Sequence, residues 1–102
     1  MMNSIEIVIC AAIWVDDKKK HYHQPTNIET GIVFCGHRHC SIYSQLDAYK
    51  INQNDHGVQG FLTSHNRFLT RKEAAELVKS NSQEMVMDRK SIRDNLYSED
   101  LY

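Results

Sequence analysis

The first hydrophobic pattern along the chain has a period of two. Apolar side chains occupy alternate positions within residues 4–15, at Ile5, Ile7, Ile9, Ala11, Ile13 and Val15. This spacing and the β-branched side chains predict a strand over about residues 4–15. The positions between them are also mostly apolar, which indicates a central strand or one that a second subunit covers.

A polar stretch and a second strand follow. The charged residues 16–20 predict a turn, and residues 21–30, which hold the only proline, predict a loop with a short edge strand around Tyr22. Residues 31–36 form an apolar run bracketed by Gly31 and Gly36, which predicts the second strand.

The period then changes to that of a helix. Ile42, Leu46 and Tyr49 lie at positions i, i+4 and i+7, so we expect an amphipathic helix over residues 37–49. The polar residues 51–59 predict a surface loop, residues 58–63 a short strand, and residues 64–66 a turn.

A second helix has a clear start signal. Thr70 and Glu73 have the spacing of a capping box, which predicts a helix from Thr70 to about Lys79. We therefore expect a single α+β domain over residues 1–102, with a small, mainly antiparallel sheet and two amphipathic helices. A chain of 102 residues buries a limited share of its surface, so dimerisation is expected to complete the core.

The composition is that of a soluble globular protein, with 41% apolar and 25% charged residues. A net charge of −1 gives no support for binding to a nucleic-acid polymer. The apolar run of residues 5–15 is too short to span a bilayer and lacks the basic flank of a signal peptide. Together with an odd number of cysteines, three, this indicates a cytoplasmic protein without a membrane partner.

One set of residues has metal or thiol chemistry. Cys35, His37, His39 and Cys40 lie close together, with His21 and His23 upstream. The set lacks a Cys-x-x-Cys or spaced His pair, and it crosses a strand-to-helix junction. A thiolate at Cys40 would need a base within reach in space, whereas free cysteines are commonly buried and inert. We assign no metal, cofactor or catalytic residue, and retain a small metal- or thiol-dependent enzyme as an alternative.

A second set favours a phosphate beside a flat ring. Arg38 and His39 precede the first predicted helix, and Arg67, Phe68 and Arg71 surround the start of the second. Helix N-termini attract anions, arginine forks bind phosphate, and aromatic faces stack on nucleobases. In the alternative interpretation, Phe61 and Phe68 are core residues and the arginines lie on the surface, one of them paired with Glu99 or Asp100.

Four blocks of the sequence carry a family resemblance. They are Cys10-Ala11-Ala12-Ile13, Gly36-x-Arg38-His39, the run from Gly60-Phe61-Leu62-Thr63 through Arg67-Phe68 and Arg71 to Glu73-Ala74, and Leu96-Tyr97-Ser98-Glu99-Asp100-Leu101-Tyr102. In this order they resemble the first family of Thoeris anti-defence proteins of phages. The resemblance covers most of the chain except residues 16–30 and 80–95. After the second helix this chain departs from the family pattern, since it has Asn81-Ser82-Gln83-Glu84-Met85 there.

The resemblance implies a binding protein that does not turn its ligand over. Such proteins sequester the cyclic ADP-ribose-type signal that a bacterial TIR-domain enzyme makes from NAD, and they work as homodimers or larger assemblies. By resemblance, Phe68 would stack on the base, three arginines would contact phosphates, and the tail would contact ribose or base. The candidate ligand-binding residues are Arg38, His39, Phe61, Arg67, Phe68, Arg71, Ser98, Glu99 and Asp100. A protein that inhibits a host factor by direct contact is a further alternative.

Overall fold

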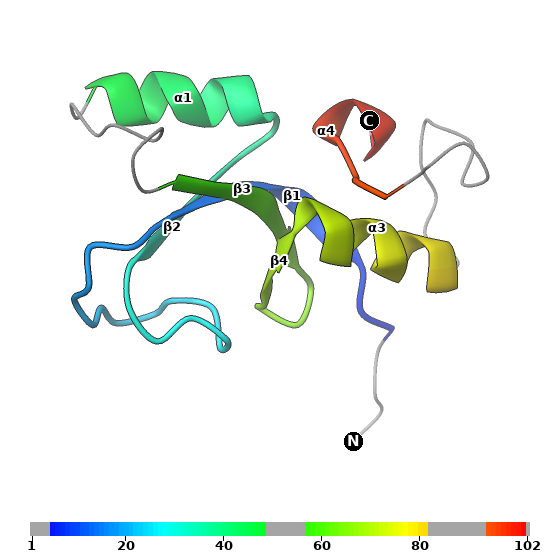
Figure 1. Ribbon diagram of the computed structural model, residues 1–102, viewed down its shortest axis with the longest axis horizontal. Coiled ribbons are helices and arrows are strands. Elements are labelled where there is room, and N and C mark those ends of the chain that lie inside the picture. The colour runs from blue at the N-terminus through cyan, green and yellow to red at the C-terminus, as the bar shows by residue number, and fades with distance from the viewer. Residues whose placement is uncertain (1–4, 49–56, 82–93, 102) are drawn as a thin grey trace.

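A four-stranded antiparallel sheet forms the centre of the molecule in the computed structural model, which describes residues 5–48, 57–81 and 94–101 (Figure 1). The strand order is β2-β1-β3-β4. The elements are β1 (Val8–Val15), β2 (Ile32–Gly36), α1 (His39–Ala48), β3 (Gly57–Thr63), β4 (Phe68–Thr70), α3 (Arg71–Ser80) and α4 (Ser98–Leu101).

The strand β1 is central, as its apolar pattern predicts. It pairs with β2 on one side and with β3 on the other, both antiparallel. The register to β3 shifts between Val8 and Cys10, so a bulge at Ile9 returns Val8 to the same face as Ala11. The expected α+β class with a small antiparallel sheet is confirmed.

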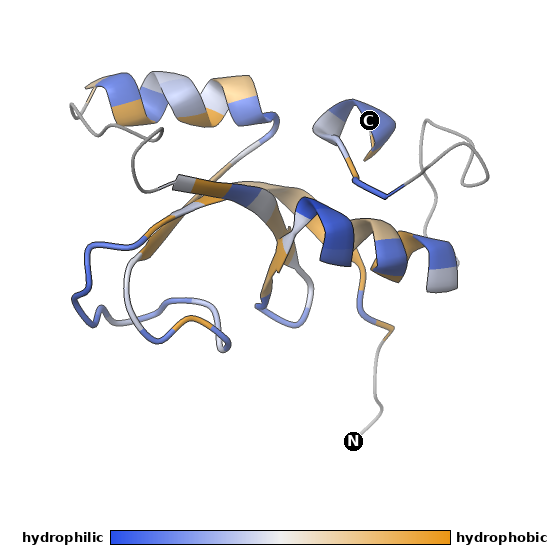
Figure 2. Cartoon of the chain, in the orientation of Figure 1, coloured by the Kyte–Doolittle hydropathy of each residue, from blue (hydrophilic) through white to orange (hydrophobic). Residues whose placement is uncertain are grey.

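The core lies between one face of the sheet and the three helices. Ile13, Phe61, Ile42, Val78 and Leu96, which come from β1, β3, α1, α3 and the segment before α4, are all fully buried there. In Figure 1, α1 and α4 lie on one side of the sheet, and the loop between β1 and β2 lies on the opposite side. Figure 2 shows the apolar colour concentrated on the strands, while α3 carries polar residues between its apolar ones.

The structure corrects several predicted boundaries. The first strand begins at Val8, because residues 5–7 are not paired as a strand. The edge strand around Tyr22 was wrong, since that residue lies in a turn and is 91% exposed. Helix α1 begins at His39, and the predicted end at Tyr49, like most of the predicted loop over residues 51–59, lies outside the described residues.

Two short elements were not predicted. Strand β4 has three residues and pairs with β3, so that Leu62 lies opposite Phe68. Close approach of these strands requires glycine at position 60, where an added Cβ would lie 2.0 Å from the Leu69 carbonyl oxygen. The tail forms the one-turn helix α4, which returns to the core through Leu101.

Candidate functional site

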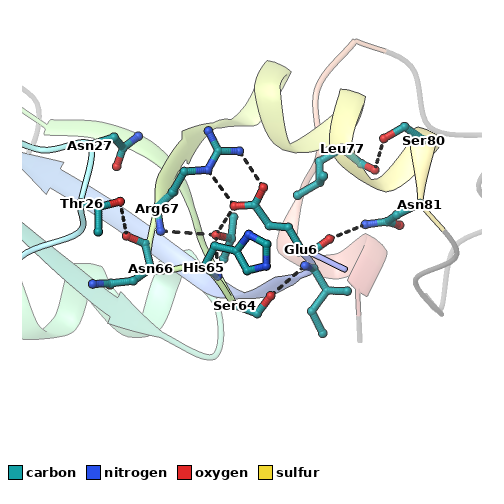
Figure 3. Close-up of polar contacts among 12 residues, drawn as sticks. Glu6, Thr26, Asn27, Ser64, His65, Asn66, Arg67, Leu77, Ser80 and Asn81 are labelled. Atoms are coloured by element: carbon teal, nitrogen blue, oxygen red, sulfur yellow. Dashed lines mark hydrogen bonds and ion pairs between the residues drawn. The ribbon is translucent and has the colours of Figure 1, made fainter. Parts of the chain in front are cut away.

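Arg67 holds the start of the chain against the turn between β3 and β4. Its Nε and Nη2 atoms donate to the two carboxylate oxygens of Glu6, each over 2.7 Å, and Thr63 Oγ1 donates to the same carboxylate over 2.6 Å. Figure 3 shows this group together with Asn81, whose Nδ2 donates to the Glu6 carbonyl oxygen over 3.0 Å. We call Glu6, Thr63 and Arg67 the Glu6 clamp.

The clamp determines the charge state of Glu6. Hydrogen bonds from Arg67 lower the pKa of the Glu6 carboxyl from 4.5 to about 2, more than burial raises it. The carboxylate is therefore ionised at neutral pH and neutralises the guanidinium that faces it. The positive charge of Arg67 is thus already paired within the protein.

The predicted capping box at the start of α3 is present. Glu73 N donates to Thr70 Oγ1 over 3.3 Å, and Thr70 N donates to Glu73 Oε1 over 2.9 Å. This reciprocal pair fixes the first turn of the helix, and with it the backbone of Arg71.

Arg71 links the start of α3 to the tail. Leu96 N donates to the Arg71 carbonyl oxygen over 3.0 Å, and Arg71 Nη1 donates to the Leu96 carbonyl oxygen over 3.2 Å. The Arg71 guanidinium carbon lies 4.7 Å from the centre of the Tyr97 ring, and Nη2 donates to Gln59 Oε1. Two of its five N–H donors are used in these bonds, so donors remain for a further acceptor.

His39, the first residue of α1, packs inward. It is 6% exposed, its Nε2 atom lies 2.8 Å from the Gly60 carbonyl oxygen, and its ring meets that of Phe61 edge-on at 5.2 Å. Burial is the largest influence on the imidazole and lowers the pKa of His39, so the ring is mainly neutral near pH 7. The charge of Arg71 also lowers the pKa of His39, and that of Glu99 raises it, both less than burial does.

The start of α1 lies over β3, where His39 reaches the Gly60 carbonyl oxygen, and the start of α3 pairs with the segment before α4 through Arg71 and Leu96. In Figure 1, α1 and α4 lie on the same side of the sheet. We call His39, Gln59, Arg71, Tyr97 and Glu99 the seam cluster. Its exposed surface includes Tyr97, which is 49% exposed, and Gln59.

Phe68 lies on the opposite face of the sheet. Its ring is 4% exposed and packs against Trp14 at 6.3 Å in a tilted geometry. The two rings border a groove of about 400 Å³ beneath the β1–β2 loop. We call it the acidic groove; it is lined by Trp14, Asp16, Asn27, Ile28, Glu29, Thr30, Val58, Phe68, Thr70 and Glu73.

The structure thus distributes the predicted ligand-binding residues over three places. Arg71 stacks on Tyr97 in the seam cluster, His39 is buried there against the core residue Phe61, and Glu99 is exposed on α4. The other predicted members of the tail are held by the fold, since Ser98 is 2% exposed and Asp100 Oδ2 accepts from Tyr97 N. Arg67 lies in the Glu6 clamp and Phe68 in the acidic groove. Arg38 precedes α1, where its carbonyl oxygen accepts from Ser41 N.

The residues proposed for metal or thiol chemistry point in different directions. Cys40 is exposed on α1, His39 is buried against Gly60, and Cys35 lies on β2 opposite Ala12. Within the described ranges, no three His, Cys, Asp or Glu side chains come together as a metal site.

Sequence reasoning missed Trp14, Gln59 and Tyr97 as site residues. Tyr97 belongs to the C-terminal sequence block of the family resemblance, beside Ser98. Its stacking on Arg71, which the structure shows, identifies it as a candidate site residue. Trp14 was read as part of a strand face, and its contact with Phe68 depends on two strands far apart in the sequence.

No described helix is long and apolar enough to cross a bilayer.

A family model places the chain among known sequences. The model for the phage T4 y16D protein matches residues 7–102, which include both the seam cluster and the acidic groove. The chain belongs to this phage protein family. No curated protein and no solved structure matches it. The family assignment supports the phage character that the sequence blocks imply.

Proposed function

We propose that the protein is a phage accessory protein that counters host defence in the host cytoplasm. In this proposal it binds a small nucleotide signal of the cyclic ADP-ribose type and holds it without degrading it. The observation that carries the proposal is the Arg71 guanidinium stacked on the half-exposed Tyr97 ring at the start of α3. Membership of a phage protein family supports the same role.

The seam cluster offers the group types that such a ligand needs. Arg71 retains N–H donors for a phosphate at a capped helix start, where backbone N–H groups favour an anion. Tyr97 has exposed ring surface for a base, and the exposed carboxylate of Glu99 can accept from ribose hydroxyls. Arg38 supplies a further positive charge before α1.

The proposed contacts differ from those that the resemblance implies. Arg67 is left out because its charge is paired with Glu6, and Phe68 is left out because it faces the other side of the sheet. His39 serves as a neutral support under the cluster, since burial lowers its pKa.

Capture and release of the signal tests the proposal. The purified protein is incubated with a lysate that contains an activated TIR-domain enzyme, reisolated and heat-denatured, and the released small molecules are identified by mass spectrometry. We expect an intact cyclic nucleotide; recovery of only cleaved products, or of none, contradicts the proposal. Light scattering of the same samples measures whether the loaded protein forms the homodimer or larger assembly expected from the sequence.

Variants of the seam cluster then locate the site. Arg71→Lys keeps the charge but loses the planar fork, and Tyr97→Leu keeps an apolar side chain but loses the ring. Each is expected to weaken capture about tenfold to a hundredfold. The matched control is Lys72→Ala, which removes an exposed positive charge at the neighbouring position of the same helix start. Equal losses in the control, or wild-type capture by both variants, place the site elsewhere.

A further inference from the structure

The acidic groove differs in chemistry from the seam cluster. Among the described residues that line it, three are acidic (Asp16, Glu29 and Glu73) and none is basic. Its floor is aromatic, formed by Trp14 and Phe68. We propose that this groove binds a small organic cation, an ammonium group on a short apolar stem.

The walls of the groove are held in place by hydrogen bonds from the β1–β2 loop. Asn27 pairs with the backbone of Phe68 in both directions: Nδ2 donates to the carbonyl oxygen over 2.6 Å, and Phe68 N donates to Oδ1 over 2.8 Å. Trp14 Nε1 donates to the Thr30 carbonyl oxygen over 2.9 Å, and Thr30 Oγ1 donates to Asp16 Oδ1 over 2.8 Å. The groove therefore exists before a ligand arrives, which lowers the cost of binding.

The loop conformation also depends on Gly31, next to Thr30. Gly31 has a φ of +94°, and an added Cβ would lie 2.4 Å from Trp14 Nε1. A positive φ of this size favours glycine, so the presence of Gly31 at this position allows the loop to approach the Trp14 ring.

The lining selects the charge of the occupant. Trp14 provides the aromatic face that attracts cations most strongly, and the carboxylates at the rim add to that attraction. One ammonium group already lies at this rim, since Lys18 Nζ is 3.0 Å from Asp16 Oδ2. Lys18 offsets the charge of Asp16, so a phosphate-bearing ligand would still meet the carboxylates of Glu29 and Glu73, which repel it. A volume of about 400 Å³ limits the occupant to a small molecule.

Fluorescence offers a direct test, because Trp14 is the only tryptophan of the chain. The intact protein is titrated with choline, with its uncharged isostere in which carbon replaces the ammonium nitrogen, and with inorganic phosphate. We expect a saturable change in Trp14 emission with choline, binding about tenfold weaker for the isostere, and no change with phosphate. Equal binding of choline and the isostere, a saturable response to phosphate, or no response to choline overturns the proposal.

Two variants that each remove one negative charge, one inside the groove and one outside it, locate the cation. Glu29 is exposed and takes no part in the hydrogen bonds that fix Asn27, Thr30 and Asp16, so Glu29→Gln is expected to fold normally and to weaken choline binding about threefold. Glu76→Gln makes the same change at an exposed position of α3 outside the groove and should leave the affinity unchanged. Equal weakening in both variants, or wild-type affinity in Glu29→Gln, contradicts a cation held at this rim. Because Arg71 and Tyr97 lie on the other face, failure here leaves the nucleotide proposal untouched.

Discussion

One face of the sheet is covered by helices that enclose a core, whereas the other is covered by a loop that leaves a groove. On the helix-covered face, Phe61 and Leu69 are packed beneath α1 and α3, and the polar groups described there include the seam cluster and the Glu6 clamp. On the loop-covered face, Trp14 and Phe68 pack on each other but also border open space. Since adjacent residues of a strand point to opposite faces, neighbours in sequence such as Phe68 and Leu69 belong to different environments.

The two faces therefore differ in what a substitution of a buried core residue or of a groove residue is expected to change. The buried residues of the helix-covered face form the contiguous core, so substitutions among them, unlike those in the exposed part of the seam cluster, act mainly on the free energy of unfolding. On the loop-covered face, hydrogen bonds between segments far apart in sequence hold Trp14, Asn27 and Phe68 around a preformed groove. Substitutions there are expected to change binding with a smaller cost in stability.

The largest expected effect compares one phenylalanine from each face. Phe61 is fully buried and contacts the His39 ring, so Phe61→Ala should lower the free energy of unfolding by about 5 kcal/mol. Phe68 borders the groove and loses fewer contacts, so Phe68→Ala should cost about 3 kcal/mol. Urea unfolding followed by far-UV circular dichroism measures both. An equal or larger loss of unfolding free energy for Phe68→Ala would contradict the assignment of the main core to the helix-covered face.

The Glu6 clamp is the polar counterpart on the helix-covered side. Glu6→Gln should lower the free energy of unfolding at pH 7 by about 1–2 kcal/mol, through the loss of charge-assisted bonds. The lowered pKa of Glu6 alone would correspond to a larger loss of unfolding free energy, but the Arg67 side chain is 43% exposed and water screens the ion pair. Urea unfolding of the wild type and of Glu6→Gln measures the difference, with Glu76→Gln as the matched control at an exposed carboxylate.

The contribution of Glu6 also has a defined pH dependence. Its pKa is about 2 in the folded protein and 4.5 as the ordinary value, so the folded state binds its proton less readily than the unfolded state. The stabilisation is therefore complete above pH 4.5 and is lost as the pH falls towards 2. The gap between the wild type and Glu6→Gln should narrow from pH 7 to pH 3; a gap that stays constant is inconsistent with the lowered pKa.

Local signals explain which parts of the fold were predictable from sequence. The capping box of Thr70 and Glu73 depends on residues three apart, and it is present as predicted. The alternation of apolar residues likewise predicted β1, apart from its start, since the described residues 5–7 are not paired as a strand. Such patterns need no knowledge of distant residues.

The candidate site was less predictable because its contacts join distant segments. Arg67 pairs with Glu6, which lies 61 residues earlier in the chain, and Arg71 stacks on Tyr97 near the C-terminal end. Sequence spacing grouped Arg67, Phe68 and Arg71 at one corner. The three-residue strand β4 separates them, since it directs Phe68 to the loop-covered face and leads into the helix that carries Arg71.

The smallest expected effect concerns reactivity on the loop-covered face rather than stability. Cys10 and Cys35 lie on neighbouring strands, with Ala12 opposite Cys35, and both thiols are half-buried. A hydrogen bond from the Cys35 thiol lowers the pKa of Cys10 from 9.0 to about 7, while the same contact raises the pKa of Cys35. A larger share of Cys10 is therefore thiolate at pH 7 than of an unperturbed thiol.

Alkylation by iodoacetamide, followed by peptide mass spectrometry, measures this thiolate directly. In a Cys40→Ser background, Cys35→Ser should raise the pKa of Cys10 towards 9.0 and slow its alkylation at pH 7 by about tenfold or more. The serine keeps a hydroxyl of similar size but donates in a different geometry, so Cys35→Ala serves as the second variant and should act in the same direction. If Cys10 reacts at the same rate in all three proteins, the two strands do not couple these thiols. In that case the loop-covered face has no chemistry beyond its groove, and the contrast between the two faces rests on packing and charge alone.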